Sequence, residues 1–149
     1  MTDLRELYQE VILDHNRSPR NKGRLENPTG LAAGHNPLCG DTVTVTLRME
    51  GGQVTDIAFD GVGCAVSTAS ASLMTEAIKG KSIDEAEKIF RSFQSMVTDA
   101  EGTEEHPELG DLEALAGVRA YPVRIKCATL PWHTLHAAMQ GEGSQVSTE

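Results

Sequence analysis

The sequence has no run of apolar residues that approaches the roughly 18 needed for a membrane-spanning helix. Its first stretch, MTDLRELYQE, lacks the basic and then apolar pattern of a secretory signal, so we expect a cytoplasmic protein with no membrane partner. Basic residues are also few: 13 Lys and Arg stand against 22 Asp and Glu, for a formal net charge of −9. Because nucleic-acid affinity rests on cations that neutralise phosphates, this balance argues against a nucleic-acid partner.

Cysteine is scarce as well, and its number is odd. The chain has Cys39, Cys64 and Cys127, and no two of them form a C-x-x-C motif. An odd number disfavours a disulfide framework and favours metal binding or thiol chemistry. The missing motif argues against a thioredoxin-like redox pair. Three thiols are one ligand short of a closed four-thiolate site, so a shared metal would need a ligand of another kind.

What the sequence does contain is hydrophobic periodicity of two kinds. Alternating apolar and polar residues predict strands over 42–49 and 54–60, joined by a Gly51-Gly52 turn, with a short strand near 31–35. Helical spacing and a Ser82–Glu85 capping box predict the helices. The helices are expected over 3–15, the small-residue stretch that ends at Gly80, 83–97, 111–116, and a last helix that starts close to Cys127 with Pro131 in its first turn.

This order of elements predicts an α+β fold, in which helices pack on one face of a small antiparallel sheet. A chain of 149 residues fits a single domain, which we place at 1–140. Residues 99–113 are acidic and poor in large apolar side chains, and we expect a mobile surface insertion there. The polar tail at 141–149 is expected to be disordered.

The surroundings of the cysteines suggest that they act together. Cys39 and Asp41 are two positions apart at the mouth of a predicted strand, so their side chains should point to the same side. Cys64 and Cys127 are expected at helix starts, where unpaired amides stabilise thiolates. All three cysteines could therefore converge at one end of the domain. With Asp41 they form a set of four ligands suited to tetrahedral Zn²⁺.

A plainer alternative is three unrelated buried cysteines, since Cys is among the residue types most often buried. The spacings of 25 and 63 residues match no local metal signature, so spacing alone is weak evidence. Charge favours the shared site. Three thiolates and one carboxylate sum to −4 and Zn²⁺ leaves −2, which Arg124 and Lys126 beside Cys127 could offset.

Longer motifs carry a resemblance to a known family. They are LYQEVILDHNRSPRNKG, NPLCGD, GVGCAVSTASASLMTEAIKGK, LGDLEALAGVRAYPVRIKCATL and a final W-x-T-L. Together they resemble the U-type iron–sulfur assembly proteins, and more closely the SufU branch, from about Leu4 to about Ala138. The resemblance implies an α+β fold with a small antiparallel sheet and packed helices. It also implies one zinc ion held by Cys39, Asp41, Cys64 and Cys127.

The same resemblance implies a function in iron–sulfur cluster assembly. SufU-like proteins accept sulfane sulfur from a persulfide on a PLP-dependent cysteine desulfurase, SufS, and pass it toward the Suf assembly machinery. This chain would then be a zinc-dependent sulfurtransferase. Its catalytic residues would be Cys39, which leaves zinc when the desulfurase docks and receives the sulfur, and Arg124, which compensates charge and contacts the partner.

Two alternatives remain open at this point. One is an IscU-type scaffold for a transient [2Fe–2S] cluster, since thiolates also ligate such clusters. The other is an interaction module whose zinc only supports folding. Two departures favour SufU over IscU: Lys126 replaces the histidine before the third cysteine, and AYPVRIKC replaces the Leu-Pro-Pro-Val-Lys chaperone segment. The insertion around 99–110 is a further SufU-like trait.

Overall fold

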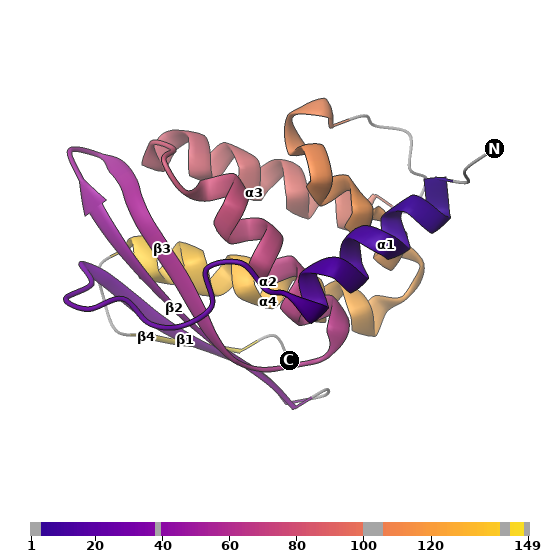
Figure 1. Cartoon of the computed structure of the whole chain (residues 1–149), viewed down its shortest axis with the longest axis horizontal. Helices are drawn as coiled ribbons and strands as arrows, with labels where there is room; N and C mark the ends of the chain where they lie inside the picture. Colours follow the sequence, from indigo (N-terminus) through magenta and orange to yellow (C-terminus); the bar gives the residue numbers. More distant parts are fainter. Residues whose placement is uncertain (1–3, 38–39, 100–105, 141–143, 148–149) are drawn as a thin grey trace.

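The computed structural model of the chain describes residues 4–37, 40–99, 106–140 and 144–147 (Figure 1). Four strands form one sheet, and the helices lie against it or extend beyond it. In chain order the elements are α1 (Leu4–Arg17), β1 (Gly30–Asn36), β2 (Asp41–Glu50), β3 (Gln53–Val62), α2 (Ala65–Ile78), α3 (Ile83–Thr98), the 3₁₀ helix η1 (Pro107–Ala120), α4 (Pro122–Met139) and β4 (Ser144–Ser147).

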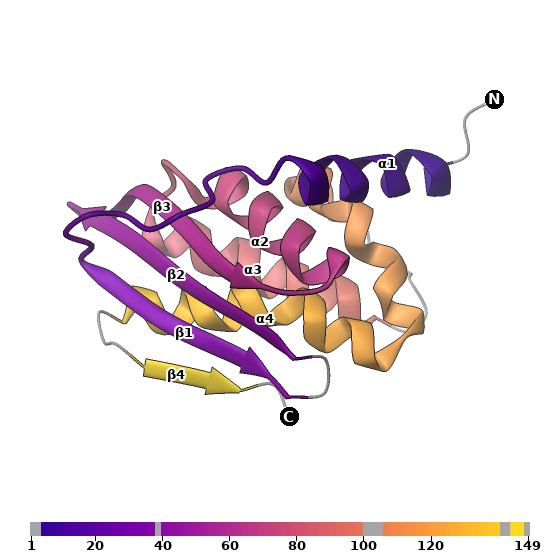
Figure 2. The ribbon, with the colours of Figure 1, turned by 60° about the horizontal axis from the view of Figure 1, so that its bottom comes forward.

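The sheet has the strand order β3-β2-β1-β4. Strand β2 pairs antiparallel with both β1 and β3, whereas β4 pairs parallel with β1. Figure 2 shows the helices gathered behind one face of this sheet, where α4 packs on β1 and β2 and α2 packs on β3. The expected α+β fold, with helices on one sheet face, is confirmed.

The core lies between the sheet and these helices. Alternation along β2 buries Val43, Val45 and Leu47, as the two-residue period of a half-buried strand requires. On the helix side, Trp132 is fully buried and stacks on Phe93 with ring centroids 4.8 Å apart.

Within the described ranges, no helix is long and apolar enough to span a membrane.

Strand β1 approaches α4 so closely that two of its positions have no room for a side chain. A Cβ at Gly30 would overlap the Ala138 carbonyl, and one at Gly34 would overlap the Thr134 hydroxyl. Because packed interiors tolerate almost no overlap, these glycines fix how β1 lies along α4. This contact sets the position of the end of β1, where the candidate site begins.

The predicted starts of α2 and α3 are confirmed. Cys64 is the N-cap of α2, and only Gly63 separates it from the end of β3. Ser82 caps α3: its hydroxyl accepts a hydrogen bond from the Glu85 amide (3.1 Å), and the Glu85 carboxylate accepts one from the Ser82 amide (3.3 Å). This is the reciprocal capping box read from the sequence.

The last helix starts earlier than the sequence predicts. Helix α4 begins at Pro122, so Cys127 lies in its second turn and Pro131 lies inside it. The prediction placed Pro131 in the first turn because proline has no N–H for the helical ladder and crowds the preceding turn. In the structure the Ser70 hydroxyl donates to the Ala128 carbonyl (2.6 Å), next to the interrupted position. A tertiary hydrogen bond thus supports α4 where its own ladder is weakened.

The acidic segment is not a surface insertion throughout. Residues 100–105 lie outside the described residues, but η1 follows them and buries Leu109 and Leu112, which are 4% and 1% exposed. The prediction of a surface segment over 99–113 is therefore wrong for its last part. Leu109 and Leu112 hold this part of the acidic segment against the domain, because burial removes their large apolar side chains from water.

The expected disordered tail is also wrong for four of its residues. Ser144–Ser147 form β4, which pairs with Ala32–His35 of β1. An edge strand presents unpaired N–H and C=O groups along its whole length. Backbone pairing can satisfy these groups whatever side chains the added strand carries, so the polar composition of the tail did not reveal the strand.

Candidate metal centre

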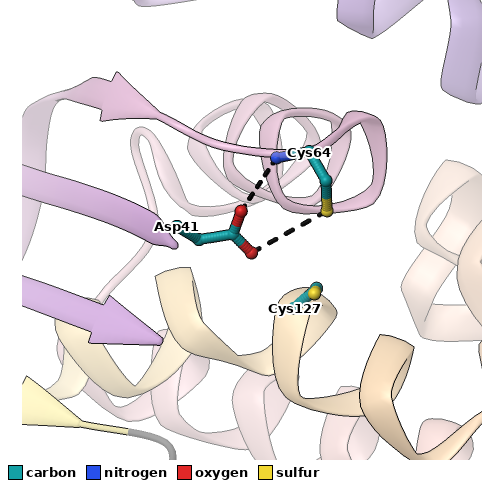
Figure 3. Close-up of side chains that lie close together, drawn as sticks. All are labelled: Asp41, Cys64 and Cys127. Carbon is teal, nitrogen blue, oxygen red and sulfur yellow. Dashed lines mark hydrogen bonds between the residues drawn. The ribbon is translucent and has the colours of Figure 1, made fainter. Parts of the chain in front are cut away.

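Three potential metal ligands from three elements meet where β1 ends and β2 begins (Figure 3). Asp41 is the first residue of β2, Cys64 caps α2, and Cys127 lies in α4. One ligand atom from each residue lies within 4.8 Å of the other two. Asp41 and Cys127 are buried and Cys64 is half-buried, so the group is sheltered but can be approached from the Cys64 side.

The Asp41 carboxylate is oriented by Cys64. Its Oδ1 accepts a hydrogen bond from the Cys64 amide at 2.9 Å, and the Cys64 thiol donates to Oδ2 across 3.8 Å. Gly63 leaves room for this approach, since a Cβ there would make tight contacts of 3.3 Å with Asp41 Oδ1 and 3.0 Å with Ser67 Oγ. One carboxylate oxygen is thereby held by the backbone, while the other faces the sulfur (Figure 3).

The two described cysteines have different surroundings. The Cys64 sulfur accepts a hydrogen bond from the Ser67 amide (3.5 Å) at the N-terminus of α2, where the helix dipole favours negative charge. The same position was predicted for Cys127, but that prediction is wrong because α4 begins five residues earlier. Cys127 is fully buried, and the side-chain amide of Asn36 donates to its sulfur across 3.7 Å.

Asn36 was not among the site residues predicted from the sequence. It is the last residue of β1 and lies opposite Asp41 in the β1–β2 pairing. The signal for it was present in NPLCGDTV, where a polar residue stands on each side of the turn at 37–40. A hairpin register would have placed Asn36 across from Asp41, and therefore at the same site.

The three residues fit a tetrahedral metal by chemistry, and the Asp41–Cys64 pair also fits by distance. Bonds of about 2.3 Å to sulfur and 2.0 Å to oxygen place a sulfur and an oxygen ligand about 3.5 Å apart around Zn²⁺. The 3.8 Å between Cys64 Sγ and Asp41 Oδ2 is close to this value. Thiolates also suit iron–sulfur clusters, so the donor set alone permits both. A four-coordinate site requires one more ligand.

Cys39, the fourth predicted ligand, lies outside the described residues. Asn36 and Gly40, described residues on either side of it, are joined by a hydrogen bond from the Gly40 amide to the Asn36 carbonyl at 2.8 Å. Asn36 contacts Cys127 and Gly40 precedes Asp41, so both residues lie beside the metal centre. The ligand and catalytic roles assigned to Cys39 stay predictions.

Arg124 lies in α4, three residues before Cys127. It is exposed in the first turn of α4 and lines a groove of ≈ 720 Å³ together with Ile12, Val66 and Tyr121. Among the described residues, we find no hydrogen bond or ion pair from its side chain to Asp41, Cys64 or Cys127. Its proposed part in catalysis stays a prediction, as does the charge compensation expected of the half-buried Lys126.

Comparison with known proteins gives a family for this arrangement. Residues 7–128 match the family model of the NifU-like N-terminal domain. The chain belongs to this family. The match spans Asp41, Cys64 and Cys127, so the whole described metal centre is part of the NifU-like domain.

Individual NifU-like relatives cover nearly the whole chain. The zinc-dependent sulfurtransferase SufU of Bacillus subtilis is 46% identical over 136 residues, which are 91% of each chain. The iron–sulfur cluster assembly scaffold protein IscU of Streptococcus pyogenes is 41% identical and covers 94% of this chain and 87% of its own. A crystal structure of an iron–sulfur cluster assembly scaffold protein for the SUF system from Fervidobacterium islandicum superimposes with a TM-score of 0.82 at 36% identity, covering 90% and 97%. The resemblance to the U-type proteins is confirmed.

Proposed function

We propose that this NifU-like chain acts in iron–sulfur cluster assembly as a zinc-binding sulfur acceptor. It would take sulfane sulfur from the persulfide of a PLP-dependent cysteine desulfurase of the SufS kind and pass it to the downstream Suf assembly machinery. The observation that carries this proposal is the meeting of Asp41, Cys64 and Cys127, with ligand atoms within 4.8 Å of one another. The similarity to a SufU that is named as a zinc-dependent sulfurtransferase supports the choice of metal and reaction.

Asp41, Cys64 and Cys127 would hold the zinc, with Cys39 as the fourth ligand. Zinc, when bound, keeps its thiol ligands deprotonated at neutral pH. The described residues contribute a sheltered position with fixed donors: the Cys64 amide holds Asp41, and the Ser67 amide faces the Cys64 sulfur. These contacts suit ligands that stay in place while a fourth residue reacts.

Cys39 is the residue to which we assign sulfur acceptance. Its thiolate would attack the outer sulfur of the desulfurase persulfide, forming a new S–S bond at Cys39 while the bond to the desulfurase sulfur breaks. The desulfurase leaves as a thiolate and Cys39 becomes the persulfide, so the transfer is redox-neutral. In the sequence, Cys39 lies between Asn36, which contacts the Cys127 sulfur, and the proposed ligand Asp41.

Arg124 and the groove beside it are assigned to the desulfurase. The groove contains apolar side chains such as Ile12 and Val66, and Tyr121 at its rim is 64% exposed. Exposed aromatic and arginine side chains are typical anchors of protein interfaces. We expect Arg124→Ala to slow sulfur acceptance while zinc content is unchanged.

The test combines metal analysis with mass spectrometry. Zinc-loaded protein is incubated with a cysteine desulfurase and cysteine, and the peptide that contains Cys39 is examined for one added sulfur atom. We expect this addition in the wild type and none in Cys39→Ala, which should keep its zinc. Cys64→Ser, which removes a proposed steady ligand, should instead lose zinc. A Cys39→Ala variant that accepts sulfur on another residue would contradict the assignment.

A scaffold for a transient [2Fe–2S] cluster is the second candidate, supported by the similarity to IscU relatives. Colour separates the two, because a zinc protein is colourless and a cluster absorbs visible light. We expect the purified protein to contain zinc and to show no visible absorption. An interaction module with purely structural zinc would accept no sulfur under any of these conditions.

A further inference from the structure

A buried amide lies against the Cys127 sulfur, and the proposed function does not use it. Asn36 is 0% exposed, and its Nδ2 donates to Cys127 Sγ across 3.7 Å. Burying a side-chain amide costs free energy unless its polar groups are hydrogen-bonded. An apolar residue at this buried position would avoid the free-energy cost of burying an amide. The presence of asparagine therefore suggests that its N–H group has a role at the Cys127 sulfur.

The fold brings this amide to the sulfur through a defined contact. Along β1, Gly30 lies against Ala138 and Gly34 lies against Thr134, so the strand runs along α4 toward the start of the helix. Asn36 comes next on the same side of the strand and reaches Cys127. Gly30 and Gly34 allow β1 to approach α4 closely, and Asn36 then places a hydrogen-bond donor at the Cys127 sulfur.

Cys127 needs such a donor more than Cys64 does. Cys64 is an N-cap, and its sulfur faces the Ser67 amide at the positive end of α2. Cys127 lies in the second turn of α4, and the effect of a helix terminus falls off within the first turn. A buried thiolate there requires another compensating group, and Asn36 supplies an N–H in the place of the helix terminus.

Asn36 is also held firmly from its other side. It pairs with Asp41 in the β1–β2 ladder, and its carbonyl accepts from the Gly40 amide at 2.8 Å. The residue that contacts the Cys127 sulfur is therefore fixed to the strand that carries the carboxylate ligand.

We infer that Asn36 is a positioning residue of the metal centre, whose amide compensates the charge of the Cys127 thiolate and keeps that sulfur directed toward Asp41 and Cys64. This inference rests on the proposed function, in which the three residues hold a metal. Residues that hydrogen-bond to metal ligands typically contribute about 10–100-fold to metal affinity. Asn36 then makes Cys127 a ligand that stays in place.

The test uses two substitutions that remove the donor. Asn36→Leu keeps the approximate size of the side chain, and Asn36→Ala shortens it. Two substitutions of different size are used because one of them could fail to pack at this buried position. Zinc affinity is measured by competition with a chelator. We expect a loss of about 10–100-fold in each variant. With Co²⁺ in place of zinc, the thiolate-to-metal charge-transfer band should shift to longer wavelength, because the sulfur lone pairs lose a hydrogen bond.

Thr46→Val is the matched control. Thr46 is 1% exposed in β2, and its hydroxyl accepts a hydrogen bond from the Leu25 amide at 3.1 Å, away from the metal centre. This variant also loses a tertiary hydrogen bond, between β2 and the segment before β1, but it should bind zinc and Co²⁺ as the wild type does. Circular dichroism of the metal-free proteins confirms that each variant is folded.

The outcomes separate the inference from the function on which it rests. Folded Asn36 variants with the zinc affinity and Co²⁺ spectrum of the wild type would overturn the inference and leave the proposed function intact. A wild type that binds neither metal would overturn both. If Thr46→Val lost as much zinc affinity as the Asn36 variants, the loss would reflect general destabilisation of the protein. That outcome would also overturn the inference.

Discussion

Asp41 combines two tasks in one carboxylate. Its Oδ1 accepts from the Cys64 amide, and its Oδ2 faces the Cys64 sulfur. The first task joins the start of β2 to the start of α2, and the second offers a ligand atom. Because the two oxygens act separately, the two tasks can be separated by substitution.

We predict that Asp41→Asn lowers zinc affinity by at least about tenfold, because a neutral amide oxygen is a poorer zinc ligand than a carboxylate. The variant keeps an oxygen that can accept from the Cys64 amide. Asp41→Ala removes the acceptor as well and should lose about 1–3 kcal/mol more in the unfolding free energy of the metal-free protein. Chelator competition and urea unfolding measure the two effects, and equal stability of the two variants would contradict this division.

At this scale the sequence indicated Asp41 but not Asn36. Asp41 stands two positions from a cysteine, and this local spacing was enough to indicate it as a candidate ligand. The partner of Asn36 is Cys127, 91 residues away, and only the packing of β1 on α4 brings them together. No local pattern contains that information.

Among the elements, β1 and α4 form the contact that positions the centre. Gly34 faces the Thr134 hydroxyl and a methyl group of Leu130, which a built Cβ would approach to 3.0 Å. Thr134 has little freedom to move, since its hydroxyl donates to the Leu130 carbonyl at 2.8 Å. A side chain at Gly34 would therefore push β1 away from α4.

We predict that Gly34→Ala lowers the unfolding free energy by about 1–3 kcal/mol, the usual cost of overpacking a well-packed interior. Gly117→Ala in η1 is the matched control, because a Cβ there meets nothing within 4 Å. That substitution should be neutral or stabilising, since alanine favours helical conformations more than glycine does. Thermal and urea unfolding of the metal-free proteins give the comparison. A neutral Gly34→Ala would show that β1 can shift on α4 without cost.

The elements that the sequence predicted best depend on local signals. Alternation in β2 and β3 and the capping box of α3 act within a few residues and were confirmed. The start of α4 was misplaced because Pro131 is accommodated by Ser70, which lies far away in the sequence. Strand β4 was missed because its pairing uses the backbone edge of β1, which no side-chain pattern records.

For the molecule as a whole, stability should depend on pH through a buried histidine. His15 of α1 is 4% exposed; its Nδ1 is 2.7 Å from Ser72 Oγ, and its Nε2 is 3.5 Å from Glu76 Oε1. Burial lowers the pKa of His15, and Arg20 lowers it further, while the nearby carboxylates act in the opposite direction. The neutral ring thus joins α1 to α2.

We predict that the unfolding free energy falls as the pH is lowered from about 7.5 to about 5.5. The folded pKa of His15 lies below the unfolded value of about 6.5, so the unfolded chain binds the proton first. Stability from the neutral ring is complete above pH 6.5 or so and is lost as the pH falls toward the folded pKa.

His15→Gln should show a weaker pH dependence than the wild type in urea unfolding of the metal-free protein. Part of the dependence should persist, because burial also lowers the pKa of His133. The exposed His35 offers the control, and His35→Gln should keep the wild-type profile. A profile for His15→Gln that matches the wild type would assign the pH dependence to other groups.

The direction of β4 has a practical consequence. Because β4 runs parallel to β1 and pairs Ser147 with His35, the described part of β4 ends at the end of β1 from which Asn36 reaches Cys127. A purification tag or fluorescent reporter fused beyond β4 would follow the strand toward this end of the sheet, where Asp41 begins β2. A polyhistidine tag would even bring competing imidazole ligands to zinc. Figure 1 shows α1, the first described helix, away from β4, so a tag that precedes α1 is the better choice for studies of metal binding.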